Sequence, residues 1–554
     1  MKNTNTLLPI SFLVTALLAG TPAYAQEQDK TAEIDKIFSW ATPSTPGCAV
    51  AASQHGKVVV NRAYGSADLE RDVPITPSTI FDAGSLQKQF VAAAVLLLVE
   101  DQRLSLSDDV RKYVPELPDT GHKITVDHLL THTSGIRDWT GLFMLVDAKP
   151  DVLTLTLRQR GLNFAPGEEF SYATSGFVLA KEIVARVSGM SFAEFARQRL
   201  FEPLGMKSSS YSVDMRNIVK NRAQAYERTQ SGRWKLAMMI DNERGGGGIL
   251  TTSADLVIWN DALANNRLGA FVSEKIQEPA RLSNGRKLSY ARGLFLDNRP
   301  PRVVWHSGSA EGYKSFLVRW PEQSISIAIT CNSGDGTDRG DFASRIFGLL
   351  APAIVASRQA PAPPPVAVEG VDVATLDLNS RAGLFFNERT GQPLRLAVQN
   401  GRLRVANGPP LVAQSKDRFC NLRPSLQFMS DDEFELHFIS QDQIEIKSME
   451  GQTTRYRRAQ PYAPTEADLQ AFAGRYRNDE VGTVFEIVPA KSGVIMRFES
   501  SPDKALEFRP VNRDTFQFRL MTMRFQRDPS DKVVGYDYSN PVIRNMKFTR
   551  LSDR

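Results

Sequence analysis

A serine and a lysine spaced for nucleophilic catalysis lie near the start of the chain. The segment Ser85-Leu86-Gln87-Lys88 follows Gly84 and leads into the apolar run from Phe90 to Val99. A run that is apolar on every side predicts a buried helix, and positions i and i+3 of a helix share a face. A serine hydroxyl is a weak nucleophile without a neighbouring base, which a desolvated lysine amine can supply. We therefore expect Ser85 to be the nucleophile and Lys88 its proton acceptor.

The same spacing also arises by chance, so the surrounding structure must decide. On the order of two Ser-x-x-Lys matches are expected in a chain of this length. A second match, Ser501-Pro502-Asp503-Lys504, contains a proline and lies between two strand-like segments. With no helix behind it, this second pair is not expected to react. The simpler alternative for Ser85 is an ordinary helix-capping serine.

Further short motifs follow Ser85 in a characteristic order. They are His128-Leu129-Leu130-Thr131-His132-Thr133-Ser134-Gly135, Pro166-Gly167, Phe170-Ser171-Tyr172, Gly245 to Gly248 with Thr251-Thr252-Ser253-Ala254-Asp255, and Trp305-His306-Ser307-Gly308. With Ser85 and Lys88, they make residues 34 to 350 resemble a family of class C-type serine β-lactamases, penicillin-recognising D,D-peptidases, D-aminopeptidases and esterases. The resemblance implies an α/β catalytic domain of the β-lactamase/transpeptidase type, with helices around an antiparallel sheet.

The resemblance also implies roles for individual residues. Tyr172 matches the family's catalytic tyrosine, which acts as a second base or proton relay. His306 matches the first position of a strand-borne triplet and completes the proton network, and Gly308 closes that triplet beside the substrate. The backbone N–H groups of Ser85 and Ser309 would form the oxyanion hole for the tetrahedral intermediate.

One position departs from the family pattern. The family usually has Tyr-x-Asn, whereas this chain has Tyr172-Ala173-Thr174. An asparagine amide can donate to a substrate carbonyl while its oxygen accepts from the lysine, but threonine is shorter and offers one hydroxyl. We expect Thr174 to contact substrate, with acylation retained and recognition of a β-lactam or peptide amide weakened.

Other polar side chains have simpler interpretations. His128 and His132 have the i,i+4 spacing of metal ligands, but Leu129 stands where a zinc peptidase has its glutamate. We therefore expect both histidines to be structural, and neither a metal nor a cofactor. Arg137 and Glu311 are interpreted as solvated loop charges, with the alternative that either anchors one end of a substrate.

The chain is too long for a single hydrophobic core and divides into several units. The expected boundaries are 1–25 for a signal peptide, 26–358 for the catalytic domain, 359–367 for a proline-rich linker, 368–460 for a first β module and 465–554 for a second. Strand pairs are expected at both ends of the catalytic domain: Gly47 to Ser53 with Val58 to Tyr64, and Lys314 to Trp320 with Ser324 to Cys331.

The two C-terminal modules are similar in sequence. Gly383-Leu384-Phe385-Phe386-Asn387 recurs at an offset of 91 as Gly474-Arg475-Tyr476-Arg477-Asn478, and Tyr456-Arg457-Arg458 matches Phe548-Thr549-Arg550. Short antiparallel strands of this kind usually close on themselves to remove exposed edges. We expect two small lipocalin-like antiparallel β-barrels.

The N-terminus predicts export. Lys2 is followed by an apolar run from Leu7 to Ala19 and by Ala23-Tyr24-Ala25, the layout of a signal peptide cleaved after Ala25. The alternative is a membrane anchor, for which the run is short. Only Cys48, Cys331 and Cys420 are present. At most one disulfide can form, and we interpret Cys48 and Cys331 as buried free thiols. The protein is expected to be periplasmic or secreted.

The composition narrows the possible partners. A net charge of +5 over 554 residues, without a basic cluster, makes nucleic acid an unexpected partner, and no later segment is long and apolar enough to span a membrane. The oligomeric state stays open. The expected substrate is a small peptide, ester or lactam.

Among the possible functions, a peptidase acting on short peptides that contain D-residues leads, because a catalytic domain followed by two β modules is similar to the layout of bacterial D-aminopeptidases. Glu311 is the candidate contact for the substrate amine. The alternatives are a carboxylesterase, a β-lactamase and a non-enzymatic penicillin-binding or cell-wall-sensing protein.

Overall fold

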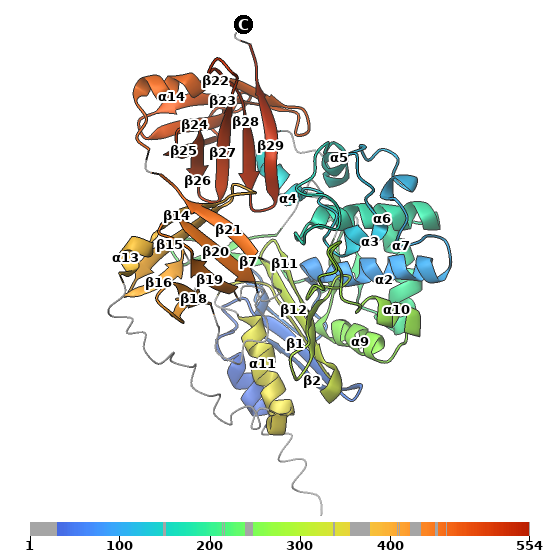
Figure 1. The fold of residues 1–554 in the computed structure, drawn as a ribbon. Helices are drawn as coiled ribbons and strands as arrows, with labels where there is room; N and C mark the ends of the chain where they lie inside the picture. The colour runs from blue at the N-terminus through green and yellow to red at the C-terminus, as the bar shows by residue number, and fades with distance from the viewer. Residues whose placement is uncertain are drawn as a thin grey trace, which may run out of the picture.

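A computed structural model gives the fold of the chain. It describes residues 30–147, 151–212, 214, 216–238, 248–335, 338–354, 377–406, 408, 410–421, 434–448, 453–460 and 462–552. The expected signal peptide and proline-rich linker lie outside the described residues. The described chain forms a helix-and-sheet catalytic unit followed by two β modules, which confirms the predicted fold class (Figure 1). Among the described helices, none combines the length and apolar character needed to cross a membrane.

A six-stranded antiparallel sheet forms the centre of the catalytic unit, in the order β10-β11-β12-β13-β1-β2. Its strands are β1 (Cys48–Gln54), β2 (Lys57–Tyr64), β10 (Phe295–Asp297), β11 (Val303–Ala310), β12 (Tyr313–Trp320) and β13 (Ile325–Cys331). Both predicted strand pairs are confirmed, and the sheet joins them because β1 pairs with β13. The N-terminal hairpin therefore completes the sheet that carries His306 to Ser309.

Smaller strands and the helices surround this sheet. The strands are β3 (Ser66–Asp68), β4 (Val73–Pro74), β5 (Phe81–Asp82), β6 (Ser210–Tyr211), β7 (Tyr226–Arg228), β8 (Trp234–Leu236) and β9 (Ile249–Thr251). The helices and helical turns are η1 (Gly84–Leu86), α2 (Gln87–Glu100), η2 (Val110–Lys112), α3 (Val126–Leu130), α4 (Trp139–Leu142), η3 (Phe143–Leu145), α5 (Val152–Leu157), α6 (Thr174–Ser188), α7 (Phe192–Ala196), η4 (Arg197–Phe201), α8 (Glu202–Leu204), α9 (Ser253–Ala264), α10 (Ala270–Lys275), η5 (Pro321–Gln323) and α11 (Arg339–Leu350).

Helix α2 is the buried helix that the apolar run predicts. Every side chain from Phe90 to Leu98 is at most 6% exposed, and the helix lies in one large core with residues of α6 and α9. The opposite face of the sheet is covered by α11 and the N-terminal helical segment, where Phe38, Trp320 and Phe347 are buried. The sheet is therefore covered on both faces, and α2 is held rigidly behind Ser85.

The interpretation of Cys48 and Cys331 as free thiols is wrong. Cys48 at the start of β1 is paired in register with Cys331 at the end of β13, and the two form a disulfide. Strand register places the two Cα atoms 4.0 Å apart, although 283 residues separate them in sequence. Cys420 is buried and takes no part in this disulfide. The sequence does not reveal the pairing, because spacing along the chain carries no information about register between distant strands.

The two β modules follow the catalytic unit. The first contains α13 (Leu378–Arg381), β14 (Gly383–Asn387), β15 (Pro393–Gln399), β16 (Arg402–Val405), β17 (Val412–Ala413), β18 (Arg418–Cys420), β19 (Phe434–Phe438), β20 (Gln443–Ser448) and β21 (Thr453–Arg458). The second contains α14 (Glu466–Phe472), β22 (Gly474–Asn478), β23 (Thr483–Ala490), β24 (Gly493–Phe498), β25 (Ala505–Asn512), β26 (Thr515–Phe518), β27 (Met521–Arg527), β28 (Val533–Asn540) and β29 (Ile543–Arg550). The strands of the second module close into a barrel. The first module is an eight-stranded sheet in the order β16-β15-β14-β21-β20-β19-β18-β17, so β16 and β17 are its edge strands.

Both modules have the same arginine-to-carbonyl contact at equivalent positions. Each begins with a short helix and a strand, and an arginine at the end of its last strand returns to that helix. Arg458 donates to the carbonyl oxygens of Ser380 and Ala382, and Arg550 donates to those of Ala471 and Ala473. This correspondence supports the sequence repeat that pairs Arg458 with Arg550.

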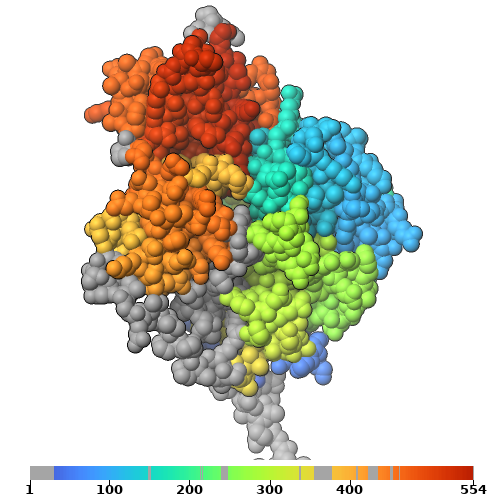
Figure 2. Space-filling view, viewed as in Figure 1, coloured from blue at the N-terminus to red at the C-terminus, as the bar shows by residue number. Residues whose placement is uncertain are grey.

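The second module shares a hydrophobic core with the catalytic unit. Leu142, Leu145, Val146 and Leu155, from the segment that spans α4 to α5, are buried in the same cluster as the barrel interior. Figure 2 shows the corresponding surfaces in contact, with the barrel in red against the teal part of the catalytic unit. A core of this kind makes the barrel an integral part of the fold rather than a tethered domain.

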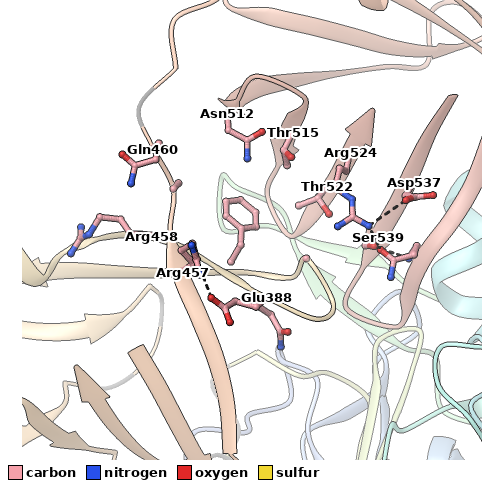
Figure 3. Close-up of a pocket in the computed structure, with 15 residues that line it drawn as sticks. Glu388, Arg457, Arg458, Gln460, Asn512, Thr515, Thr522, Arg524, Asp537 and Ser539 are labelled. Atoms are coloured by element: carbon pink, nitrogen blue, oxygen red, sulfur yellow. Dashed lines mark hydrogen bonds and ion pairs between the residues drawn. The ribbon is translucent and has the colours of Figure 1, made fainter. Parts of the chain in front are cut away.

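A cavity of about 480 Å³ lies between the two modules (Figure 3). Its walls carry one ion pair from each side. Glu388 and Arg457 of the first module are 3.0 Å apart, and Arg524 and Asp537 of the barrel are 3.3 Å apart. The modules therefore face each other through polar side chains at this point.

Candidate active site

Ser85 and Lys88 meet at the N-terminal end of the buried helix. Ser85 lies in the helical turn η1, which continues directly into α2, so the two side chains project from the same face. Lys88 Nζ donates to Ser85 Oγ at 3.1 Å. Lys88 is 1% exposed, and within the described part of the chain it forms no ion pair with a carboxylate. The sequence prediction that these two side chains touch is confirmed by the geometry.

Two glycines allow strand β11 to pack against the turn that carries Ser85. Gly84 has φ +55°, and a Cβ built on it would lie 2.6 Å from the backbone nitrogen of Ser309. A Cβ on Gly308 would lie 2.0 Å from the carbonyl oxygen of Ala83. Both distances are far below any real Cβ contact, so only glycine fits at either position. The close approach brings the backbone of Ser309 to the turn that carries Ser85, where the oxyanion hole is expected.

Tyr172 lies two residues before α6. Lys88 Nζ is 4.7 Å from the centroid of the Tyr172 ring, and the ring of His132 contacts it in a tilted arrangement with a centroid distance of 4.2 Å. The structure thus brings three predicted residues, Ser85, Lys88 and Tyr172, into one cluster. The ring of Tyr172 therefore contacts both the amine of Lys88 and an aromatic ring.

The loop before Tyr172 is fixed by backbone hydrogen bonds to the motif that contains His132. Ser171 N donates to the carbonyl of His132 at 2.9 Å, and Gly167 N donates to that of Thr133 at 2.8 Å. A Cβ on Gly135 would lie 2.0 Å from the carbonyl oxygen of Phe164. The motif from His128 to Gly135 therefore positions the tyrosine loop.

His306 is buried beside Lys88 but is bonded to other groups. Its Nδ1 lies 2.6 Å from the carbonyl oxygen of Ser307, and its Nε2 lies 3.3 Å from the hydroxyl of Tyr290. Tyr290 in turn is 3.1 Å from Nε2 of His132. Burial, together with the nearby charge of Lys88, lowers the pKa of His306 to about 3, so its imidazole is neutral near pH 7.

Thr174 is the first residue of α6, and Asp138 holds its backbone. The N–H of Thr174 donates to the Asp138 carboxylate, whose other oxygen accepts from Thr140 N at 2.8 Å and so caps α4. Asp138 is 3% exposed. The position that departs from the family pattern is therefore fixed by its backbone at the N-terminus of a helix.

Two titratable side chains near Ser85, Asp82 and Lys181, have strongly shifted pKa values. Burial raises the pKa of Asp82 to about 6, while its carboxylate accepts from Gly84 N at 2.8 Å. Burial and the charge of Lys88 lower the pKa of Lys181 to about 8. Two lysines and a carboxyl group thus share a poorly solvated region beneath Ser85, and perturbed titratable groups of this kind are typical of active sites.

Glu311 and Lys314 lie in the hairpin formed by β11 and β12, close to Ser309. Glu311 lies in the turn between β11 and β12, and Lys314 Nζ donates to Ser309 Oγ. Burial lowers the pKa of Lys314, and the negative charge of Glu311 partly offsets this effect. Both signs of charge are therefore present beside the expected oxyanion position.

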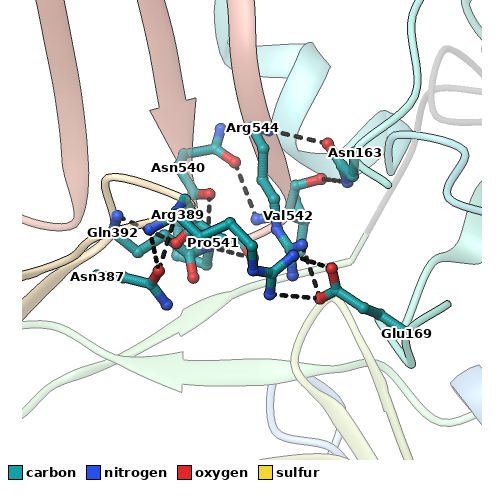
Figure 4. A network of polar contacts seen from close by, with 10 residues as sticks. Asn163, Glu169, Asn387, Arg389, Gln392, Asn540, Pro541, Val542 and Arg544 are labelled. Carbon is teal, nitrogen blue, oxygen red and sulfur yellow. Dashed lines mark hydrogen bonds and ion pairs between the residues drawn. The ribbon is translucent and has the colours of Figure 1, made fainter. Parts of the chain in front are cut away.

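Both β modules bind the loop that leads into Tyr172. Arg389 of the first module makes a two-pronged contact with the carboxylate of Glu169, and Arg544 of the barrel donates to the same carboxylate at 2.9 Å (Figure 4). Asn163, on the same loop, donates to the carbonyl of Val542 and accepts from Arg544 N. Three parts of the chain therefore converge on Glu169, which sequence reasoning missed because each partner lies hundreds of residues away.

The comparison with known families agrees with this geometry. A family model described as Beta-lactamase matches residues 31–348, which is more than half of the chain. The chain belongs to the β-lactamase family. Membership in this family and similarity to D-aminopeptidases make the protein a serine hydrolase.

The alignments of this β-lactamase family member with two relatives cover different shares of the chain. The chain is 24% identical over 540 residues to a D-aminopeptidase of Brucella anthropi, which covers 92% of this chain and 96% of the relative. It is 28% identical over 317 residues to penicillin-binding protein 4* of Bacillus subtilis, which covers 52% of this chain and 68% of the relative. Similarity to the D-aminopeptidase therefore extends through both β modules.

A solved structure supports the fold. An octameric penicillin-binding protein homologue from Pyrococcus abyssi superimposes with a TM-score of 0.51 at 23% identity, covering 78% of this chain and all of that one. At this level of identity the likeness concerns the fold of the β-lactamase family alone.

The structure corrects the interpretation of Arg137. The side chain is 5% exposed rather than solvated, and its Nη1 lies 2.7 Å from Oε2 of Glu480 in the second module. The backbone N–H of Arg160 donates to the same carboxylate at 2.9 Å. The sequence predicts a solvated Arg137 because its partner, Glu480, belongs to a separate module 343 residues further along the chain.

The other polar residues that the sequence motifs of this β-lactamase family member contain make contacts that support the fold. His128 Nδ1 accepts from the backbone N–H of Thr125 and caps α3. Ser501 and Lys504, the second match to the serine–lysine spacing, both bind the carboxylate of Asp147 at 3.1 Å. Residues 245–247 of the glycine run lie outside the described chain. The second serine–lysine pair is thus part of a contact between barrel and catalytic unit.

Proposed function

We propose that this serine hydrolase forms an acyl-enzyme on Ser85. The observation that carries the proposal is the 3.1 Å contact between Lys88 Nζ and Ser85 Oγ, made by a lysine that is 1% exposed. A hydroxyl in this position has a base within hydrogen-bond reach, which a nucleophilic serine requires. Both groups lie at the end of a rigid, buried helix, so the contact is preorganised.

The chemistry proceeds in two steps. Ser85 Oγ attacks the substrate carbonyl carbon while its proton passes to the amine of Lys88, and the N–H groups of Ser85 and Ser309 stabilise the oxyanion. Tyr172, next to Lys88, donates its hydroxyl proton to the leaving amine or alcohol as the tetrahedral intermediate collapses to the acyl-enzyme, and takes up the proton that Lys88 received. Water then gives a proton to the same pair of side chains and attacks the ester carbonyl. That proton returns to Ser85 Oγ as the acid is released. His306 supports this network as a neutral side chain.

The proposed substrates are short peptides that contain D-residues, cleaved at their free N-terminus. The support is the similarity to a D-aminopeptidase across 92% of this chain, both β modules included. Glu311 is proposed to bind the substrate ammonium from the turn between β11 and β12. Glu311→Gln should raise KM for peptides with a free amine and leave N-acetylated analogues unaffected. An equal effect on both would remove this role.

Export to the periplasm or medium is part of the proposal. The N-terminal sequence has the layout of a cleaved signal peptide. The buried disulfide between Cys48 and Cys331 supports the same compartment, because disulfides persist in oxidising environments. Mass analysis of the protein from culture fluid or periplasm should show a mature N-terminus at Gln26.

Covalent labelling tests the nucleophile. Intact-mass analysis after incubation with a fluorophosphonate should show one adduct, which Ser85→Ala abolishes. Ser501→Ala is the matched control, because Ser501 has the same spacing to a lysine but binds Asp147. It should retain the adduct. Labelling that persists in Ser85→Ala would overturn the proposal, and a wild-type protein that takes up no reagent would favour a non-enzymatic binding protein.

A carboxylesterase is the second candidate, and Thr174 favours it. Ester hydrolysis depends less on recognition of the amide, for which the family usually supplies asparagine at this position. A panel of D- and L-amino-acid anilides, short acyl esters and a chromogenic cephalosporin separates the candidates. The peptidase proposal predicts that D-anilides give the highest kcat/KM, whereas highest activity on esters or on the cephalosporin would replace it with an esterase or a β-lactamase.

A further inference from the structure

We propose that Tyr290 is a positioning residue whose hydroxyl ties the strand of the oxyanion hole to the segment that carries the catalytic tyrosine. The proposal rests on the function assigned above to Tyr172 and Ser309. It concerns a residue that none of the sequence motifs contains.

The hydroxyl of Tyr290 bridges two buried histidines. It lies 3.1 Å from Nε2 of His132 and 3.3 Å from Nε2 of His306, and all three side chains are at most 2% exposed. His132 follows α3, whereas His306 lies in β11, so the bridge joins two walls of the site. Hydrogen bonds between buried polar groups hold a fixed geometry, because water cannot substitute for a lost partner.

The direction of each hydrogen bond follows from the histidine at one end. Nδ1 of His306 faces the carbonyl oxygen of Ser307 at 2.6 Å, so Nδ1 carries the proton and Nε2 of the neutral ring accepts. Tyr290 must therefore donate its single proton to His306, and its oxygen accepts from Nε2–H of His132. Nδ1 of His132 is then left as the acceptor for the backbone N–H of Ala173, at 3.0 Å.

This chain of hydrogen bonds ends at Ala173, which lies between Tyr172 and Thr174. By accepting from Ala173 N–H, His132 fixes the backbone on which both side chains stand, and its ring packs on that of Tyr172 at a centroid distance of 4.2 Å. At the other end, His306 precedes Gly308 and Ser309 on β11. The separation between the catalytic tyrosine and the oxyanion hole is thus set through the hydroxyl of Tyr290.

The charge state of His306 is part of the arrangement. Its titratable neighbours are Lys88 from α2, Tyr172 before α6, His132 after α3 and Tyr290 before β10. Burial and the charge of Lys88 lower its pKa. By stabilising the neutral ring, a hydrogen bond from Tyr290 to Nε2 acts in the same direction. Removal of the hydroxyl should therefore raise the pKa of His306.

Tyr290→Phe tests the proposal, because it keeps the ring and removes only the bridge. We expect the rate of fluorophosphonate labelling at Ser85 to fall about 10- to 100-fold, as small misplacements of reacting groups do. Tyr476→Phe is the matched control. Tyr476 is fully buried in the barrel and donates to the carbonyl of Phe472 at 2.8 Å, so this variant also loses one buried hydrogen bond. It should label at the wild-type rate.

Selective ¹⁵N labelling of the six histidines gives a readout that a purely structural role would not move. In the wild type, His132 should carry its proton on Nε2 and His306 on Nδ1, with the two signals assigned by their loss in His132→Asn and His306→Asn. In Tyr290→Phe, His306 should titrate at higher pH. His132 should change to the Nδ1–H form, because the carbonyl of Ala173 lies 3.1 Å away.

The outcomes separate this proposal from the proposed function. Unchanged tautomers and an unchanged labelling rate in Tyr290→Phe would overturn the positioning role while leaving the nucleophile in place. A wild-type protein that takes up no reagent would overturn the proposed function, and the histidine tautomers would still decide whether the bridge exists.

Discussion

Arg544, in the last strand of the barrel, donates to the carboxylate of Glu169 at 2.9 Å, on the loop that leads into Tyr172. Arg389 from the first module binds the same carboxylate, whose side chain is 10% exposed. Burial alone would raise the pKa of Glu169, but the two guanidinium groups outweigh it and lower the pKa below its ordinary value. One carboxylate therefore couples both modules to the loop of the proposed catalytic tyrosine.

Glu169→Gln should weaken this coupling and the activity together. Removal of the charge leaves Arg544 buried without its partner, so we expect the protein to lose about 2–4 kcal/mol of stability. The labelling rate of Ser85 should fall as the tyrosine loop shifts. Glu168→Gln, at the neighbouring exposed carboxylate, is the control and should change neither quantity. Equal thermal unfolding midpoints in the two variants would contradict the prediction.

The same contact predicts a pH dependence. Because the pKa of Glu169 is lowered in the fold, its contribution to stability is fully present above the ordinary carboxyl range and is lost as pH falls through the folded value. The difference in unfolding midpoint between wild type and Glu169→Gln should therefore be largest at neutral pH and shrink below about pH 4. A difference that grows on acidification would contradict this sign.

Cys48→Ala should destabilise the catalytic unit. The disulfide closes a loop of 283 residues, and the removal of such a cross-link typically costs about 2–4 kcal/mol. Thermal unfolding without reductant measures the loss, and reductant should lower the midpoint of the wild type but not that of the variant. Alkylation in denaturant without reduction gives a second check, since it should modify Cys420 alone. Modification of all three cysteines would show that the bridge is absent.

Local motifs predict the residues of the proposed reacting centre but not the contacts that support it. Ser85 and Lys88 are one helical turn apart, so their contact follows from helix geometry and from the apolar run behind them. Tyr172 and Gly308 were identified by family motifs with fixed order. These residues depend on short segments whose local structure the sequence encodes.

The supporting contacts depend on distant pairings that carry no local signal. Tyr290 bridges two histidines through a hydroxyl, and nothing in the residues around it indicates this. The sequence suggests that Arg137 is solvated, because the carboxylate that pairs with it, that of Glu480, lies in another module. Cys48 and Cys331 form a bond only because β1 and β13 pair in one register. Long-range register and module docking have to be observed in the fold.

Gly308→Ala should abolish activity through a backbone clash. The added Cβ would lie 2.0 Å from the carbonyl oxygen of Ala83, which cannot move without shifting the turn that carries Ser85. We expect loss of fluorophosphonate labelling and a lower unfolding midpoint. Gly121→Ala is the control, because its Cβ meets no atom within 4 Å. It should keep full activity and lose only about 1–2 kcal/mol for the positive φ. Active Gly308→Ala would contradict the close approach.

Thr174→Asn tests what the departure from the family pattern does. A neutral hydrogen bond to the substrate amide contributes about 1 kcal/mol, and a site built to make it discriminates more strongly. We therefore expect the ratio of kcat/KM for D-anilides to that for matched esters to rise about 5- to 10-fold. Thr174→Val, which keeps the shape and removes the hydroxyl, should not raise this ratio. An unchanged ratio in Thr174→Asn would mean that the side chain at this position does not contact the scissile amide. Because Asp138 fixes the backbone of residue 174, the change should act through the side chain alone.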